Sequence, residues 1–260
     1  MSRPDELRDT PLHDRGDFTG MHHHKWMPWV ADLFCGRGGV GRTLNSLYHN
    51  SNWFGADIEP YGDDYPGQFI QADLINNPPL SFPTAHLIWV SFPCTAYSSL
   101  SPIHYGSTEA ALEANPRITE SGIRKFARDN GVHYVIENVP RATKIGDLEA
   151  NVRLNGLAFG QRFNMERHFE TSFECPDAYV EGDADVTLST RGDQSIQALA
   201  DAKGVPASWG KQDVRSAMPD SYVKWILHHC PSTPCPKPDR SQTVLQDGPD
   251  PHALAPTGNP

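Results

Sequence analysis

Apolar runs of strand length alternate with helix-like stretches along the central part of this chain, and this alternation constrains its fold most strongly. The runs predict strands at five places: residues 29–34, 53–57, 68–72, 86–91 and 133–137. Helices are predicted over residues 40–48 and 118–130, with Gly131 as the stop signal of the second. Such alternation is typical of a parallel sheet covered by helices on both faces. The chain is therefore predicted to be α/β, with its ligand at the carboxyl ends of the strands.

Length and composition limit the other possibilities. A chain of 260 residues fits one domain with a small appendage. Residues 1–25 are polar without periodicity and residues 231–260 are rich in proline, so we expect a disordered leader and a disordered tail around a folded part at 26–230. No apolar run approaches the ~20 residues of a membrane span, and the first residues lack the apolar core of a signal peptide. We expect a soluble, cytoplasmic protein without a membrane partner.

Cysteines and charge exclude further classes. The five cysteines are odd in number and scattered, which argues against a disulfide framework. Only Cys230 and Cys235 are close, without a second pair, so no metal site is predicted. The formal net charge of −10 argues mildly against a nucleic-acid partner, but total charge does not exclude a local basic face.

A glycine-rich turn follows the first predicted strand. Residues 35–41 read Cys-Gly-Arg-Gly-Gly-Val-Gly and open the first predicted helix. Glycines let the backbone turn sharply and approach a ligand, and a helix N-terminus offers free amides. A plain tight turn is the alternative. The Gly-Lys-Ser/Thr pattern of phosphate-binding loops is absent, which disfavours a nucleoside triphosphate.

Carboxylates follow the second and third predicted strands. Asp57 ends the second strand, where a carboxylate can accept both ribose hydroxyls of a nucleoside cofactor. Asp73 follows the third strand and is placed to hold the amino group of an adenine. Each acid alone is more often a turn residue. Together, after successive strands, the two acids favour a nucleoside pocket.

A cysteine and a glutamate follow two further strands. Cys94 stands directly after Pro93, in a loop beyond strand 86–91. Glu137 ends the strand 133–137. Because the carboxyl ends of parallel strands meet at one edge of a sheet, an acid is predicted beside a nucleophile. A buried structural cysteine and a capping glutamate are the alternatives.

In this order, the segments resemble motifs of the C5-cytosine-specific DNA methyltransferases, above all their compact, phage-like forms. The matching stretches are residues 32–39, 93–98 and 137–139, and the likeness covers roughly 29–173 and, more faintly, 209–225. The resemblance implies a Rossmann-like fold, a mostly parallel sheet with an antiparallel hairpin, and S-adenosyl-L-methionine as the cofactor. The residues that it places around this cofactor are Phe34, Gly36, Gly38, Gly39, Asp57, Ile58, Asp73, Leu74 and Pro93.

The resemblance also implies a mechanism. Cys94 would add as a thiolate to C6 of cytosine, which turns C5 into a carbon able to attack a methyl sulfonium. Glu137 would hold N3 and the exocyclic amine, and Asn138 would hold the loop that bears Cys94. The implied partner is DNA, with the target cytosine flipped out of the duplex. We expect the protein to act as a monomer.

The chain departs from the family pattern at its next motif, Arg-x-Arg, whose second arginine contacts the cytosine O2. Residues 165–167 read Met-Glu-Arg, so Arg167 matches the second arginine and Met165 replaces the first. The contact of the first arginine is either missing or supplied by Arg162. A surface residue of the hairpin is the alternative for Arg167. Thr95 stands where many members have glutamine, which bears on how the loop closes.

Recognition of a target sequence is the least determined property. Residues 174–208 leave room for a hairpin and a short helix, whereas base readout in the major groove needs several side chains on a rigid element. Short or relaxed sequence recognition is predicted. A C-terminal helix near residues 216–222 is expected beside the cofactor.

Three functions are compared. The leading hypothesis is a DNA cytosine-5 methyltransferase with a reduced recognition region. The acidic charge and the short segment 174–208 keep open RNA or a free pyrimidine nucleotide as the substrate. A protein that holds DNA or cofactor without turnover is the third hypothesis, and the presence of both Cys94 and Glu137 argues against it.

Overall fold

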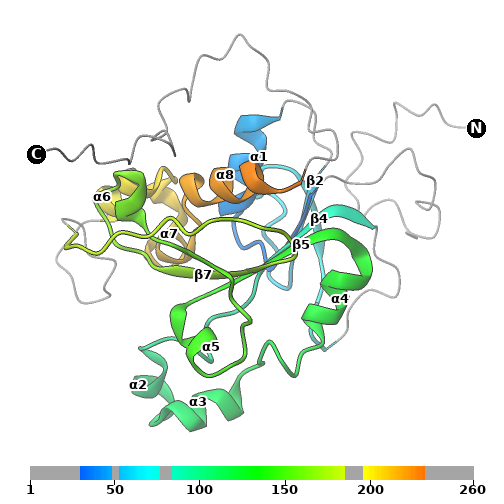
Figure 1. The fold of residues 1–260 in the computed structure, drawn as a ribbon, viewed down its shortest axis with the longest axis vertical. Coiled ribbons are helices and arrows are strands. Elements are labelled where there is room, and N and C mark those ends of the chain that lie inside the picture. The colour runs from blue at the N-terminus through cyan, green and yellow to red at the C-terminus, as the bar shows by residue number, and fades with distance from the viewer. Residues whose placement is uncertain (1–29, 49–52, 77–83, 185–195, 232–260) are drawn as a thin grey trace, which may run out of the picture.

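Seven strands form one mixed sheet in the computed structural model, which describes residues 30–48, 53–76, 84–184 and 196–231 (Figure 1). The strand order is β3-β2-β1-β4-β5-β7-β6. Pairing is parallel from β3 to β5, whereas β7 runs antiparallel to both β5 and β6. The strands are β1 (Val30–Leu33), β2 (Trp53–Asp57), β3 (Gln68–Gln71), β4 (Ala85–Ser91), β5 (Gly131–Asn138), β6 (Val152–Leu154) and β7 (Arg167–Thr171). The predicted Rossmann-like sheet with an antiparallel hairpin is confirmed.

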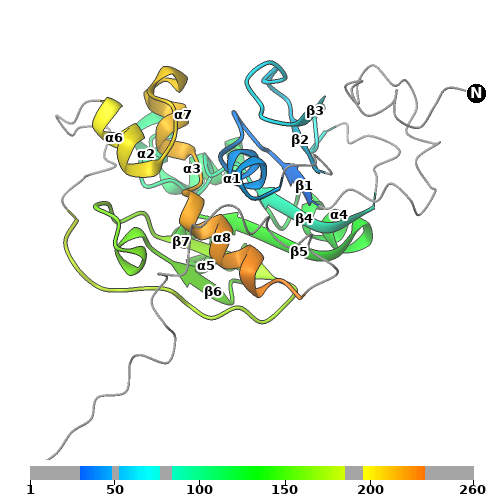
Figure 2. The same ribbon diagram turned by 90° about the horizontal axis from the view of Figure 1, so that it is seen from above.

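Helices cover both faces of this sheet. In chain order they are α1 (Gly39–Leu47), α2 (Ser101–Tyr105), α3 (Thr108–Ala114), α4 (Ile123–Asn130), α5 (Pro140–Lys144), α6 (Ile196–Lys203), α7 (Lys211–Ser216) and α8 (Asp220–His229), with 3-10 turns η3 (Gly156–Phe159) and η4 (Ala207–Trp209). Helices α1 and α8 lie side by side on one face, and α4 and α5 pack on the other (Figures 1 and 2).

Burial on both faces explains why the central strands read as unbroken apolar runs. Successive side chains of a strand point to opposite faces, so a strand covered on both sides needs apolar residues at every position. In β4, Ile88 and Val90 pack in the cluster with α4, whereas Leu87 and Trp89 pack in the cluster with α1 and α8. The predicted strand 53–57 agrees with β2 at both ends.

Helix α4 corrects the predicted helix over residues 118–130. The helix ends at Asn130 as predicted but begins only at Ile123, after Gly122 in the left-handed region (φ 72°). The preceding residues form a turn in which Ser121 N donates to Arg117 O at 2.9 Å. Gly131 does not end the helix in a left-handed cap, because its backbone is extended and already belongs to β5.

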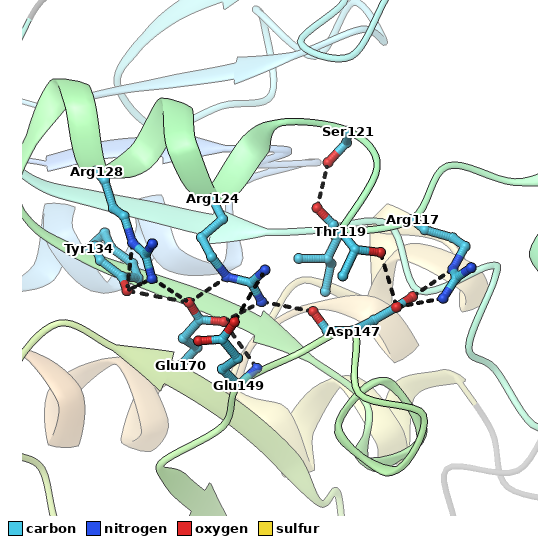
Figure 3. Close-up of polar contacts among 10 residues, drawn as sticks. Arg117, Thr119, Ser121, Arg124, Arg128, Tyr134, Asp147, Glu149 and Glu170 are labelled. Atoms are coloured by element: carbon cyan, nitrogen blue, oxygen red, sulfur yellow. Dashed lines mark hydrogen bonds and ion pairs between the residues drawn. The ribbon is translucent and has the colours of Figure 1, made fainter.

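Charged side chains tie α4 to β7 and to the loop after α5 (Figure 3). Arg117 donates to both carboxylate oxygens of Asp147, at 2.8 and 2.6 Å. Arg124 donates to both oxygens of Glu170, at 2.8 Å each. We call these four residues the α4 network. Its two carboxylates are buried and paired with arginine on both oxygens, which satisfies the requirement for buried charge.

Several expectations concern residues outside the described part of the chain. These are the leader at 1–25, the tail from residue 232 onward and residues 185–195 of the predicted recognition segment. Within the described residues, no helix has the length and apolar character required to span a membrane.

Candidate active site

The glycine turn lies at the carboxyl end of β1 and contains unusual backbone angles. Phe34 has a backbone φ of 55°, which residues other than glycine rarely adopt. Gly36 and Gly38 have φ values of 53° and 88°. Gly38 is also the residue from which α1 starts. Backbone strain of this kind is maintained only where the surroundings enforce it, and it is common at ligand sites.

The three predicted glycines of the turn differ in what surrounds them. A Cβ atom at Gly38 would lie 2.6 Å from Pro66 Cδ, and one at Gly39 would lie 2.7 Å from Met218 N. These two glycines are therefore required for packing. A Cβ atom at Gly36 would meet no protein atom within 4 Å, so the space beside it is open. Gly36 is the point of the turn that a ligand can approach.

Asp57 connects the end of β2 to this turn. Its carboxylate accepts hydrogen bonds from Gly36 N at 2.9 Å and from Glu59 N at 3.0 Å. Ile58, the next residue, exposes 55% of its surface beside this carboxylate. An acid and an exposed apolar side chain thus stand together at the edge of the sheet.

The two predicted cofactor-binding residues that follow β3, Asp73 and Leu74, have local structural roles. Asp73 accepts hydrogen bonds from Ile75 N and from the backbone and side-chain amides of Asn76, which lower the pKa of Asp73. It therefore has the turn role that the sequence left open. Leu74 is buried in the core cluster beneath α4. The structure gives its side chain a packing role.

Cys94, Glu137 and Arg167 come together at the neighbouring strand ends. The register pairs Ser91 of β4 with Glu137 of β5, so the loop bearing Cys94 begins beside the glutamate. Arg167 is the first residue of β7, and its Nε lies 2.8 Å from Glu137 Oε1. The predicted meeting of an acid and a thiol at one edge is present.

Burial and charge set the protonation of this group. Burial raises the pKa of the Cys94 thiol, the positive charge of Arg167 lowers it, and the negative charge of Glu137 raises it further. Burial also raises the pKa of Glu137, against the opposing charges of Arg167 and Lys203. Burial thus opposes the ionisation of both the carboxyl and the thiol, and the positive charge of Arg167 favours the ionisation of both.

The loop that bears Cys94 is held from both sides. Asn138 is fully buried, and its Nδ2 donates to Phe92 O at 2.9 Å. On the far side, Tyr97 donates from its hydroxyl to Asp147 of the α4 network at 3.0 Å. The Phe92 ring also meets the ring of Phe34 edge to face, with centroids 5.4 Å apart, which joins the thiol loop to the glycine turn.

Four further residues that the sequence analysis named differ in how deeply they are buried. Pro93 is half-buried between Phe92 and Cys94, whereas Thr95 and Arg162 are exposed. Met165 is buried in a cluster with Leu199 and Ala200 of α6. The position that matches the first arginine of the family motif is thus part of an apolar core.

Two residues near the site were missed by the sequence analysis. Lys203 is buried, and this burial lowers its pKa well below the ordinary value, as does the positive charge of Arg167, whereas the negative charge of Glu137 raises it. Tyr222 of α8 donates from its hydroxyl to Met165 O at 2.5 Å. The helical spacing of Ile196, Leu199, Ala200 and Lys203 is the signal that places this lysine on an apolar face.

Behind the glycine turn, Asp32 is a buried acid. Tyr65 donates from its hydroxyl to Asp32 Oδ2 at 3.0 Å. Burial raises the pKa of Asp32 to about 8, in spite of this hydrogen bond. Asp32 is therefore mainly neutral at pH 7 and adds little charge beneath the turn.

The C-terminal segment corrects the helix expected near residues 216–222. Helix α7 ends at Ser216 and α8 begins at Asp220, with an irregular break between them. Pro219 explains the break, because the residue before a proline is disfavoured in helical conformation. Met218 in this break lies against Gly39, so the segment does pack beside the glycine turn.

The described residues of the predicted recognition segment, 174–208, form the short helix α6 and the start of the 3-10 turn η4. Residues 174–184 contain no strand and form one isolated bridge, from Ala178 to Leu154. No group of metal-binding side chains occurs among the described residues.

No protein-family model matches the chain, and no curated protein is similar enough to count as a relative. Similar solved structures include the Entamoeba histolytica methyltransferase EhMeth, at 11% identity over 78% of this chain and 98% of that chain, with a TM-score of 0.47. A TehB-like SAM-dependent methyltransferase from Corynebacterium glutamicum has 20% identity over 42% of this chain and 54% of its own, with a TM-score of 0.26. A mutant of Spodoptera frugiperda DNMT2 has 13% identity over 65% and 61%, with a TM-score of 0.35. All three TM-scores lie below 0.5, so we base no functional inference on these likenesses.

Proposed function

We propose that this protein transfers a methyl group from S-adenosylmethionine to C5 of cytosine in DNA, through a covalent adduct of Cys94. The observation that supports this function most is the meeting of Cys94, Glu137 and Arg167 at the carboxyl ends of β4 and β5. A thiol, a carboxyl whose pKa is raised by burial and a cation paired with that carboxyl are groups that addition to a pyrimidine ring can use.

The neighbouring strand ends fit the cofactor. The strand order reverses between β1 and β4, which is where an open α/β sheet binds its ligand. Gly36 has open space beside it, Asp57 has the position and charge to accept ribose hydroxyls, and Phe34 and Ile58 offer apolar surface. When bound, S-adenosylmethionine supplies an electrophilic methyl group.

The chemistry of the protein side chains follows from their positions. Cys94 gives its proton to a water molecule, and the sulfur of the thiolate forms a bond to C6 of the cytosine as the double bond between C5 and C6 opens. Glu137 donates its proton to N3 as electrons move into the ring, and Arg167 donates hydrogen bonds to O2. After C5 gains the methyl group, water takes the C5 proton, the bond between sulfur and C6 breaks, and Glu137 takes back the proton from N3.

The DNA substrate is part of the proposal, and the sequence keeps an alternative open. A net charge of −10 does not favour strong, salt-dependent binding to duplex DNA. RNA and a free cytidine nucleotide are therefore included as substrates in the test.

The test measures transfer of tritium from methyl-labelled S-adenosylmethionine to duplex DNA, RNA and CTP. We expect transfer to DNA, and its loss in Cys94→Ala. Cys230→Ala is the matched control, because Cys230 lies at the end of α8, and this variant is expected to keep the activity. Transfer to RNA or CTP alone would overturn the DNA assignment, and transfer to none of the three would overturn the proposed function.

A further inference from the structure

Three side chains at the start of β7 form a connected set of hydrogen bonds. His168 Nδ1 lies 2.9 Å from Thr143 Oγ1 of α5, and His168 Nε2 lies 2.9 Å from Glu166 Oε1. The imidazole is mostly buried, with 12% of the side chain exposed. We call Thr143, His168 and Glu166 the β7 clamp. Because both ring nitrogens have a partner, the orientation of the imidazole is fixed.

The partners of the imidazole also determine how it bonds. A carboxylate only accepts hydrogen bonds, so His168 Nε2 is the nitrogen that donates, to Glu166 Oε1. The hydroxyl of Thr143 can donate or accept, so it can pair with His168 Nδ1 in the neutral ring and in the charged ring. The β7 clamp is therefore compatible with both protonation states of the imidazole.

The β7 clamp lies where the pairing of β7 with β5 stops. The last register pair between these strands is Asn138 with His168, so Arg167 lies one residue beyond it. After Asn138 the chain continues into α5, which carries Thr143. The hydrogen bond between Thr143 and His168 therefore extends the connection between the two segments past the end of the ladder.

Arg167 stands between two members of the β7 clamp in the sequence. Glu166 and His168 contact each other on one face of the chain, and Arg167 between them points to the opposite face. Arg167 Nη1 donates to Glu166 O at 2.9 Å, and Arg167 Nε lies 2.8 Å from Glu137 Oε1. Fixing Glu166 therefore fixes the carbonyl that orients the guanidinium toward Glu137.

We propose that His168 is a positioning residue, which holds the Arg167 guanidinium against Glu137 by tying Glu166 to α5. This inference rests on the proposed function, in which Arg167 donates hydrogen bonds to O2 of the cytosine. A guanidinium has more N–H donors than the two described contacts use, so donors remain for this oxygen. The β7 clamp would set the plane in which they are presented.

The experiment follows the Nε–H group of Arg167 by NMR, in protein labelled with nitrogen-15 arginine. Loss of one signal in Arg167→Lys assigns it. His168→Phe keeps a flat ring and removes both nitrogens. In this variant, exchange of the Arg167 Nε proton with water should become about tenfold faster, the equivalent of one hydrogen bond to a charged group. The Nε–H group of Arg117, which donates to Asp147, is the internal reference and should not change.

Two further variants separate the β7 clamp from the general effect of a buried mutation. His168→Gln places an amide nitrogen near the position of Nε2, so it can still donate to Glu166, and exchange at Arg167 should stay within about threefold of wild type. His86→Phe is the matched control, because His86 is a histidine near the opposite end of β4 from Cys94. We expect this control to leave both the exchange rate and methyl transfer unchanged.

A change at the other end of the hydrogen bond keeps the test decisive if His168→Phe does not fold. Glu166→Ala removes the acceptor of the β7 clamp at a half-exposed position and keeps the carbonyl that accepts from Arg167. Exchange of the Arg167 Nε proton should again become about tenfold faster. Exchange at the wild-type rate in Glu166→Ala, or in a folded His168→Phe, would overturn the inference.

Methyl transfer provides a separate readout. Because the proposed function places Arg167 against the cytosine and not against the cofactor, His168→Phe should lower kcat about tenfold and leave KM for S-adenosylmethionine unchanged. A higher KM for the cofactor at an unchanged kcat would overturn the positioning role. If the wild-type protein transfers no methyl group while exchange at Arg167 responds as expected, the proposed function fails and the positioning of Arg167 by His168 stands.

Discussion

Two buried glutamates lie on the neighbouring strands β5 and β7, and their pairings with arginine are built differently. Glu170 of β7 belongs to the α4 network, and both of its oxygens accept from Arg124, with Glu149 N and the Tyr134 hydroxyl as further donors (Figure 3). Glu137 of β5 is almost as buried, but the direct contact described for its carboxylate is the one to Arg167.

We propose that this difference separates a structural pair, Glu170 with Arg124, from a reactive pair, Glu137 with Arg167. A carboxylate that accepts hydrogen bonds at both oxygens is fixed in place, and it stabilises the fold by tying distant segments together. A buried carboxyl with free acceptor capacity is costly to ionise, and it can exchange a proton with a ligand. Residue types alone do not distinguish the two pairs, whereas the number of donors around each carboxylate does.

The largest effect is expected from a change in the reactive pair. Glu137→Gln keeps the shape of the side chain but removes the exchangeable proton. Methyl transfer should fall by about 10²- to 10³-fold, the usual range for loss of a general acid. Initial rates with tritiated cofactor measure this, with protein folding checked by circular dichroism. A rate within threefold of wild type would refute the assigned role of Glu137.

The equivalent change in the α4 network should act on stability instead. Glu170→Gln removes one charge of a buried pair and leaves Arg124 without its partner, which costs about 3 kcal/mol of the free energy of unfolding. Urea denaturation measures this loss. At a temperature where the variant is folded, its methyl transfer should stay within a few-fold of wild type. A stable but inactive Glu170→Gln would contradict the division between the two pairs.

The smallest effect is a difference in how stability depends on pH. Although burial opposes it, hydrogen bonds from Arg117, Tyr97 and Thr119 hold the pKa of Asp147 below its ordinary value of 3.8. The stabilisation that Asp147 provides is therefore complete above pH 3.8 and is lost as the pH falls through its folded-state pKa. Asp147→Asn should be destabilising at pH 7 and much less so below pH 3.

The contribution of Glu137 to stability should depend on pH in the opposite direction. Its pKa is raised from 4.5, so the folded state binds more protons than the unfolded state above that pH, and stability falls as the pH rises. Position 137 does not titrate in Glu137→Gln, so this variant should gain stability relative to wild type as the pH rises above 4.5. Urea denaturation across this range measures both variants, and parallel pH profiles would show that the two carboxyls do not differ.

The strands and the meeting of Cys94 with Glu137 were predictable because they depend on local patterns and on one topological rule. Burial on both faces makes β2 and β4 readable as apolar runs, and parallel pairing brings their carboxyl ends to one edge. The start of α4 was not predictable in the same way. Arg117 and Thr119 are held by Asp147, which lies 30 and 28 residues further along the chain.

The burial of Lys203 is a second feature that could not be predicted from the sequence. A lysine at the end of a helix is normally interpreted as a solvated residue near the negative end of the helix dipole. Its burial depends on the packing of α6 in the cluster of Met165 and on its hydrogen bond to Arg215 O of α7, neither of which is visible in the local sequence. The apolar spacing of α6 was present in the sequence, but only the tertiary structure shows that the end of this helix is covered.

The packing of the glycine turn also bears on the order in which the protein matures. Arg37 Nε lies 2.6 Å from Asp213 Oδ2 of α7, a contact across 176 positions of the chain, and Gly39 lies against Met218. During synthesis, the ribosome releases the turn long before it releases the residues that cover it. The glycine turn is therefore covered only when α7 and Met218 have emerged, and a chain interrupted before that point would have the strands and the turn without this cover.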